Sequence, residues 1–129
     1  MTMNTREEIL AEYLEHTSFG ADYSHFDKVP LSKLKELTEA GLIDRDECQN
    51  DSPTTEEFMK LMKAHKGFTA HGYIIGGNRS DKRATIEGVE GIVSADKLPD
   101  VLATLRHADE LTIINEGATN EFRVRAWWD

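Results

Sequence analysis

The sequence predicts an α+β fold, in which three N-terminal helices precede a β-β-α-β-β unit that forms a mainly antiparallel four-stranded sheet. Apolar residues recur at helical spacing within residues 1–66. Two segments rich in β-favouring residues, joined by a glycine-containing turn, occupy residues 67–93, and apolar and polar residues alternate in the last nine positions. We expect a single domain over residues 1–129, with a helical half at about 1–66 and a sheet-forming half at about 67–129.

Capping signals predict where the first two helices begin and end. Thr5 and Glu8 form a capping box for a first helix that runs to about His16. A second helix is expected over about residues 30–40, and Gly41 stands where a left-handed residue would end it.

The third helix has two competing starting points. Ser52 before Pro53 is a good N-cap, and Thr54 with Glu57 forms an overlapping capping box. The aromatic Phe58 then opens an apolar stripe that continues to position 65. A helix should therefore begin at one or the other of these two caps.

Two segments between the helices lack a clear period and are expected to be loops. Residues 17–29 mix glycine and serine with aromatic residues, which favours an ordered loop or short turn packed on the first helix. Residues 44–51 include four acidic residues and no apolar period, and they are expected to form an exposed loop. Their spacing does not match a calcium loop, because the sixth-position glycine and the twelfth-position glutamate are missing.

Residues 67–93 are expected to form a β-hairpin whose turn lies at positions 76–81. Because this hairpin follows three predicted helices, it also resembles the wing of a winged-helix fold, with Arg79, Lys82 and Arg83 reaching phosphates. Glu56 and Glu57 at the start of the third helix argue against contact with DNA. A hairpin within a sheet is therefore favoured.

The remainder of the chain supplies a fourth helix and two more strands. Asp96 is expected to cap the helix, with Pro99 in its first turn. Its predicted inward stripe consists of Leu98, Val101, Leu102 and Leu105. Residues 111–114 and 121–128 are expected to be the third and fourth strands.

Composition narrows the classes of function. The formal net charge is −9, with a pI near 5.0, which argues against a general nucleic-acid binder. A basic protein partner, or simply solubility, would account for the acidic excess. Cys48 is the single cysteine, so no internal disulfide is expected. With neither an apolar signal segment nor a run of 18 apolar residues, we expect a cytoplasmic protein without a membrane partner.

No pattern in the sequence indicates catalysis, a cofactor or a metal. Five histidines are present, but His65 and His71, the two closest in sequence, do not have the spacing of helical metal ligands. Cys48 has acidic neighbours in sequence, which would raise the pKa of its thiol and disfavour a nucleophilic role. We therefore expect no catalytic residue, no metal site and no cofactor.

The C-terminal strand provides the candidate binding surface. Its alternation places Arg123, Arg125 and Trp127 on one face, and His71 and Tyr73 share one face of an earlier strand. Arginine and tryptophan are common in binding hot spots. The competing interpretation is structural, with both arginines paired across the sheet with Glu87 or Glu90.

Two main functions remain open from the sequence. The first is a non-catalytic module that binds or inhibits a protein partner, and the second is a small-molecule or nucleotide-binding protein that uses the face with Arg123, Arg125, Trp127, His71 and Tyr73. A winged-helix regulator is the third.

Overall fold

Five strands form one antiparallel sheet in the order β1-β2-β3-β5-β4. The computed structural model describes residues 5–14, 23–76, 80–115, 117 and 120–129. The strands are β1 (Tyr23–Val29), β2 (Thr69–Ile75), β3 (Arg83–Ser94), β4 (Glu110–Asn115) and β5 (Glu121–Trp127).

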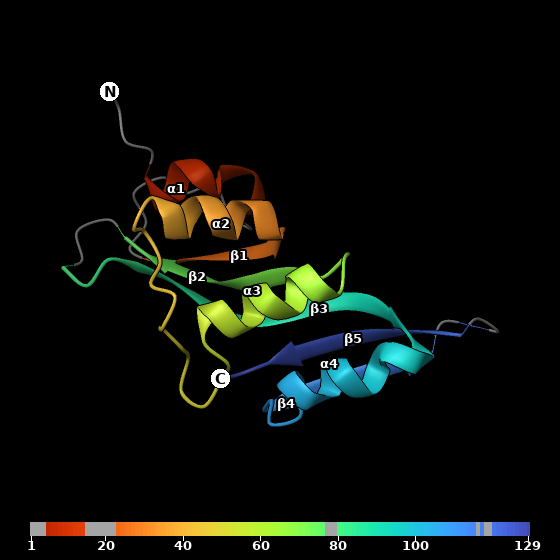
Figure 1. Ribbon diagram of the computed structural model, residues 1–129. Helices are drawn as coiled ribbons and strands as arrows, with labels where there is room; N and C mark the ends of the chain where they lie inside the picture. The colour runs from red at the N-terminus through yellow and green to blue at the C-terminus, as the bar shows by residue number, and fades with distance from the viewer. Residues whose placement is uncertain (1–4, 15–22, 77–79, 116, 118–119) are drawn as a thin grey trace.

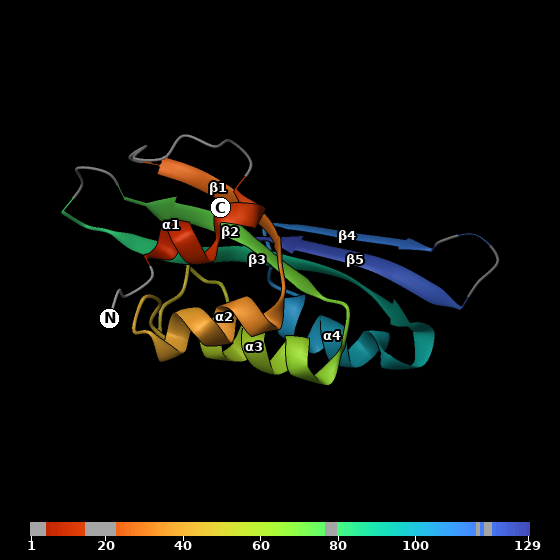
Figure 2. The same ribbon diagram turned by 90° about the horizontal axis from the view of Figure 1, so that it is seen from above.

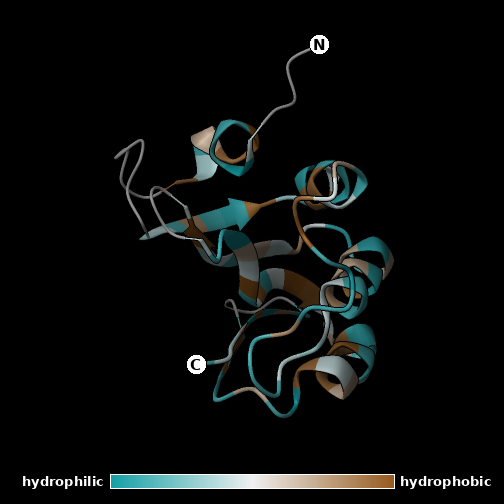
Figure 3. Cartoon of the chain, turned by 90° about the vertical axis from the view of Figure 1, so that its left-hand side faces the viewer, coloured by the Kyte–Doolittle hydropathy of each residue, from teal (hydrophilic) through white to brown (hydrophobic). Residues whose placement is uncertain are grey.

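The longer helices cover one face of this sheet. They are α2 (Leu31–Glu39), α3 (Thr55–Ala64) and α4 (Leu98–Leu105), and they lie side by side in one layer, in front of the sheet in Figure 1 and below it in Figure 2. The short helix α1 (Arg6–Ile9) and the 3-10 turn η1 (Ala11–Tyr13) lie beyond them, next to β1 (Figure 3). We call the sheet face turned away from α2, α3 and α4 the open face.

The α+β class is confirmed, but the predicted four-stranded sheet behind three helices is wrong. Residues 23–29, expected to be a loop, form β1 and pair with β2 from Tyr23 opposite Ile75 to Val29 opposite Ala70. A register shift between Phe26 and Val29, with Lys28 at a φ of 58°, interrupts the two-residue alternation. The inward residues Phe26 and Val29 are therefore three positions apart, so no strand period is visible in the sequence.

The first helix is also shorter than predicted. Helix α1 ends at Ile9, and Leu14 forms an isolated antiparallel bridge with Phe26 of β1. Positions 15 and 16 of the expected helix lie outside the described residues. The chain thus leaves the helix early, and Leu14 contacts the edge of the sheet.

The predicted hairpin is confirmed as β2 and β3, with Ile75 opposite Arg83. Both strands lie inside the sheet, because β2 also pairs with β1 and β3 also pairs with β5. This central position gives no support to a projecting wing. Arg79, expected at its tip, lies outside the described residues.

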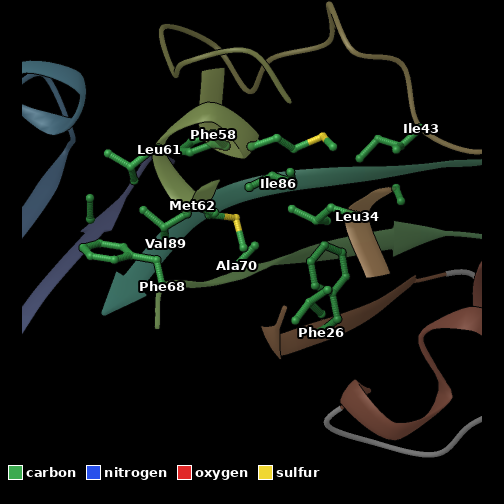
Figure 4. Close-up of a cluster of buried hydrophobic side chains, with 14 of the residues drawn as sticks. Phe26, Leu34, Ile43, Phe58, Leu61, Met62, Phe68, Ala70, Ile86 and Val89 are labelled. Carbon is green, nitrogen blue, oxygen red and sulfur yellow. The ribbon is translucent and has the colours of Figure 1, made fainter. Parts of the chain in front are cut away.

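The core lies between the sheet and the three helices (Figure 4). The alternation predicted for the last strand is confirmed, since Val124, Ala126 and Trp128 are all buried. In the stripe predicted for the fourth helix, Val101 and Leu105 are fully buried, whereas Leu98 and Leu102 are only partly buried.

Two of the predicted capping boxes are confirmed. The Thr5 hydroxyl accepts from the amide of Glu8, and the Thr54 hydroxyl accepts from the amide of Glu57 at 3.2 Å. Of the two competing caps for α3, Thr54 therefore takes the position. Ser52 instead accepts a bond from the Gln49 amide within the preceding loop.

Of the other two predicted helix ends, the C-terminal end of α2 is confirmed and the N-terminal cap of α4 is wrong. Gly41 follows α2 with a φ of 72°, and the Leu42 amide donates to the Leu37 carbonyl at 2.9 Å, as in a Schellman motif. The cap predicted for α4 is wrong, since the N-cap residue is Lys97 and Asp96 lies in the 3-10 turn η2 (Ala95–Lys97). This extra turn moves the helix start two residues beyond the expected cap.

The loop over residues 44–54 packs against the first half of β3. Strand β5 pairs only with positions 88–94 of β3, so positions 83–87 have no strand on that side. The Thr85 hydroxyl donates to the Glu47 carboxylate at 2.9 Å, and the Tyr73 hydroxyl donates to Gln49 Oε1 at 3.0 Å. Part of the segment expected to be an exposed loop is thus attached to the sheet through side-chain hydrogen bonds.

Candidate functional site

Cross-strand rows of side chains organise the open face. In one row His71 of β2, Gly88 of β3 and Trp127 of β5 are neighbours, and in the next row Glu90 lies opposite Arg125. Gly88 has no side chain, and the imidazole of His71 extends into the space that a Cβ atom there would occupy. The imidazole and the Trp127 indole therefore lie on either side of Gly88 in this row.

A shallow cavity of about 260 Å³ opens at this place. Side chains from four strands line it, because β1, β2, β3 and β5 all pass beneath it. The lining residues with polar or aromatic side chains are His25, Asp27, His71, Glu87, Arg125 and Trp127. The structure therefore brings together three of the five residues predicted from sequence, namely His71, Arg125 and Trp127.

His71 is the most unusual member of this cavity. Its side chain is buried, with an exposed fraction of 7%, and its Nε2 atom has no hydrogen-bond partner. Burial, reinforced by the positive charge of Arg125, lowers the pKa of His71 to about 4. The imidazole is therefore neutral at pH 7, and one of its nitrogens is an unsatisfied polar group, a feature that calls for an explanation.

Glu87 reaches the cavity because of a β-bulge. Ile86 and Gly88 pair with Gly72 and His71, which leaves Glu87 as the additional residue of β3. Burial raises the pKa of the Glu87 carboxyl, although His25 at 3.9 Å and a hydrogen bond with the Trp127 side chain oppose this effect. The bulge thus places a partly desolvated carboxylate beside an indole.

Arg125 has only a loose ion pair. Its Nε atom lies 3.9 Å from Glu90 Oε2, and both side chains are partly exposed to solvent. A surface pair of this kind contributes about 0–1 kcal/mol to stability. The structural interpretation was right about the partner of Arg125, but the pair is weak and the guanidinium remains accessible.

The other two predicted residues lie outside this cavity. Arg123 lines a separate hollow of about 440 Å³ together with Lys28 and Glu90. Tyr73 is buried beside the cavity, where its ring stacks on Tyr23 with centroids 5.3 Å apart. Its hydroxyl holds the 44–54 loop, so its role in this structure is to attach that loop to the sheet.

Sequence reasoning missed three contributors to the cavity. His25 and Asp27 were missed because β1 was expected to be a loop. Glu87 was considered only as an ion-pair partner for the arginines, since a bulge cannot be read from the alternation of one strand. The available signal for β1 was its content of β-favouring residues, Tyr23, Phe26 and Val29, just before Pro30.

No protein-family model, curated protein or solved structure matches the chain. Among the helices of the described residues, none is both long enough and apolar enough to cross a membrane. Within the same residues, no group of three or more His, Cys, Asp or Glu side chains is arranged to hold a metal ion. The open face of the sheet is therefore the part of the molecule from which a function is inferred.

Proposed function

We propose that this chain is a non-catalytic, cytoplasmic binding module that takes a basic protein partner on the open face of its sheet. The observation that carries the proposal is the cavity of about 260 Å³ on the open face, where the carboxylates of Asp27 and Glu87 lie beside the Trp127 indole. Charged and aromatic side chains that meet in a surface hollow are typical of a place where a partner inserts a side chain.

The size of the cavity favours a protein over a free small molecule. Pockets for drug-sized ligands usually measure about 300–1,000 Å³ and enclose most of the ligand. A hollow of about 260 Å³ suits one inserted side chain. Exposed apolar and aromatic residues elsewhere on the sheet, Tyr23, Ile92 and Ile114, would contact the surrounding surface of the partner.

The charges around the cavity favour a basic side chain in it. Asp27 and Glu87 contribute two carboxylates, Arg125 contributes one cation, and His71 is neutral at pH 7. A lysine or arginine from the partner would neutralise the desolvated Glu87 and lie against the Trp127 indole. The net charge of −9 would also speed association with a basic protein at low salt.

Capture from the native cell extract, followed by titration of the purified partner, tests this proposal. Glu87→Gln and Trp127→Ala should each weaken binding, whereas Glu39→Gln, an exposed change on α2, should not. Trp127 is partly exposed and Trp128 is buried, so partner binding should change tryptophan emission, and Trp127→Phe should abolish the change. A partner whose affinity is unaffected by both cavity variants would contradict the proposal.

A small-molecule ligand is the second candidate, supported by the guanidinium and the indole that share the cavity. A planar anionic compound could pair with Arg125 and stack on Trp127. A thermal-shift screen with nucleotides and anionic metabolites tests this alternative. A hit that is lost in Arg125→Ala but kept in Glu87→Gln would favour it over a basic protein.

A further inference from the structure

Strand β4 forms an uncovered edge of the sheet. It is the last strand in the order, so no strand among the described residues pairs with its outer side. Five of its six residues are exposed, and its register with β5 is continuous, without a bulge. The unpaired N–H and C=O groups of such an edge are a template for another strand.

The opposite edge of the sheet is protected. Leu14 bridges to Phe26 on the outer side of β1, and the register shift with the positive φ of Lys28 distorts that strand. Covered or bulged edges of this kind resist pairing with other chains. Strand β4 has no such bulge, and it contains neither lysine nor proline.

The side chains of β4 are suited to burial on both sides of the strand. Ile113 is 41% exposed and Ile114 is 48% exposed, and successive residues of a strand point to opposite faces. Glu110 is the only charged residue of the strand. In a chain with a net charge of −9, this edge is a nearly neutral, apolar strip.

We propose that β4 pairs antiparallel with β4 of a second copy of this chain, about a two-fold axis at Thr112. The two five-stranded sheets would then form one continuous sheet, with an isologous interface. An identical strand fits because antiparallel pairing about an axis perpendicular to the sheet keeps each residue on its own face, so Leu111 meets Ile113 on the face that the helices cover.

The register is chosen by comparing the cross-strand pairs that each position of the two-fold axis would create. With Thr112 on the axis, Thr112 faces Thr112 of the second copy, Leu111 faces Ile113, and Glu110 faces Ile114. Threonine pairs and apolar pairs are favourable across strands, and no carboxylate faces another. An axis at Ile113 would place Leu111 opposite the polar Asn115, so the apolar pair of Leu111 with Ile113 would be lost.

The mass of the protein in solution is the first test. Light scattering at micromolar concentration should give twice the 14.6 kDa of one chain. Thr112→Lys, which places two ammonium groups at the axis, and Ile113→Lys should each give the mass of one chain. Ile92→Lys, an equally exposed change on β3 away from this edge, should remain dimeric.

A single-chain mass for the wild type, or a double mass that survives both edge variants, would overturn the proposal. Circular dichroism establishes that each variant is folded. The proposed partner-binding face is tested separately with Ile113→Lys, because Ile113 pairs with the buried Val124 on the opposite face, whereas Thr112 is the cross-strand neighbour of Arg125.

Disulfide formation tests the register independently. In a Cys48→Ser background, which removes the natural thiol, Thr112→Cys should give a cross-linked dimer under mild oxidation. Ile113→Cys should cross-link much more slowly, because its counterpart lies two residues along the facing strand. Equal yields from both variants would overturn the axis at Thr112.

Discussion

The His71 imidazole occupies space that exists only because residue 88 is glycine. A Cβ atom at position 88 would lie 2.6 Å from His71 Nε2 and 1.9 Å from the carbonyl oxygen of Ala126. The second contact is with backbone of the paired strand, so rotation of a side chain cannot relieve it. Gly88 thus allows both the close pairing of β3 with β5 and the seating of His71.

Gly88→Ala should therefore destabilise the protein. Forcing an additional carbon into a well-packed place costs about 1–3 kcal/mol, and separating two paired strands should bring the cost to the upper part of this range. Urea denaturation followed by circular dichroism measures the loss. A variant as stable as the wild type would show that β3 and β5 are further apart than the structure has them.

Leu105→Ala should cost about 2–5 kcal/mol, because Leu105 is fully buried and its removal leaves a cavity. Leu102→Ala, three residues earlier on α4, is the matched control and should cost clearly less, since Leu102 is only partly buried. Chemical denaturation of both variants gives the comparison. Equal losses of unfolding free energy would mean that α4 turns a different side toward the sheet, with Leu102 as deeply buried as Leu105.

Thr54→Ala should lower stability by about 0.5–2 kcal/mol, because it removes the side-chain acceptor for the Glu57 amide. Amide exchange at Glu57 should accelerate as the first turn of α3 loses its cap. Ser32→Ala, an exposed change on α2, is the control and should have little effect. If Thr54→Ala leaves both stability and exchange unchanged, the capping box makes no net contribution.

Acidification should destabilise the wild type more than a variant that lacks His71. The pKa of His71 is about 4 in the folded protein, whereas an exposed histidine of the unfolded chain has a pKa of 6.5. Between these two pH values the unfolded chain therefore binds one more proton at this residue than the folded protein does. Stability is therefore lost as the pH falls from about 6.5 to 4, by on the order of 3 kcal/mol for this group.

Unfolding free energies at pH 7 and pH 4.5 for the wild type and His71→Gln measure this effect. The raised pKa of Glu87 acts in the opposite direction, but it is present in both proteins and largely cancels in the comparison. Thr69→Val on the same strand should keep the wild-type pH dependence. An identical pH dependence in His71→Gln would show that the imidazole does not stay neutral in the fold.

The sequence was most informative where one local pattern determines the structure. The capping boxes at Thr5 and Thr54, the glycine end of α2 and the alternation of β5 each depend on residues close together in the chain, and each is confirmed. Strand β1 could not be predicted in this way. Its alternation is interrupted near Lys28, and it is stabilised mainly by pairing with β2.

The candidate site was predictable only in part for the same reason. One strand's alternation placed Arg125 and Trp127 on the same face, which the structure bears out geometrically. The positions of Glu87 and His25 depend on a bulge and on the order of strands, which are properties of the whole sheet. Arg123 lies on the same face, but it pairs with Ile92 further along β3 and lines a different hollow.

The long connection between β1 and β2 has a consequence for the order in which the molecule folds. Ile75 pairs with a residue eight positions later, whereas Val29 pairs with Ala70, 41 positions along the chain. Closing the longer loop costs more chain entropy, so β1 should dock after the β2–β3 hairpin has formed. The docking of β1 also brings His25 and Asp27 to the cavity, so the binding surface would be the last part of the molecule to mature and the first to be lost when the fold opens locally.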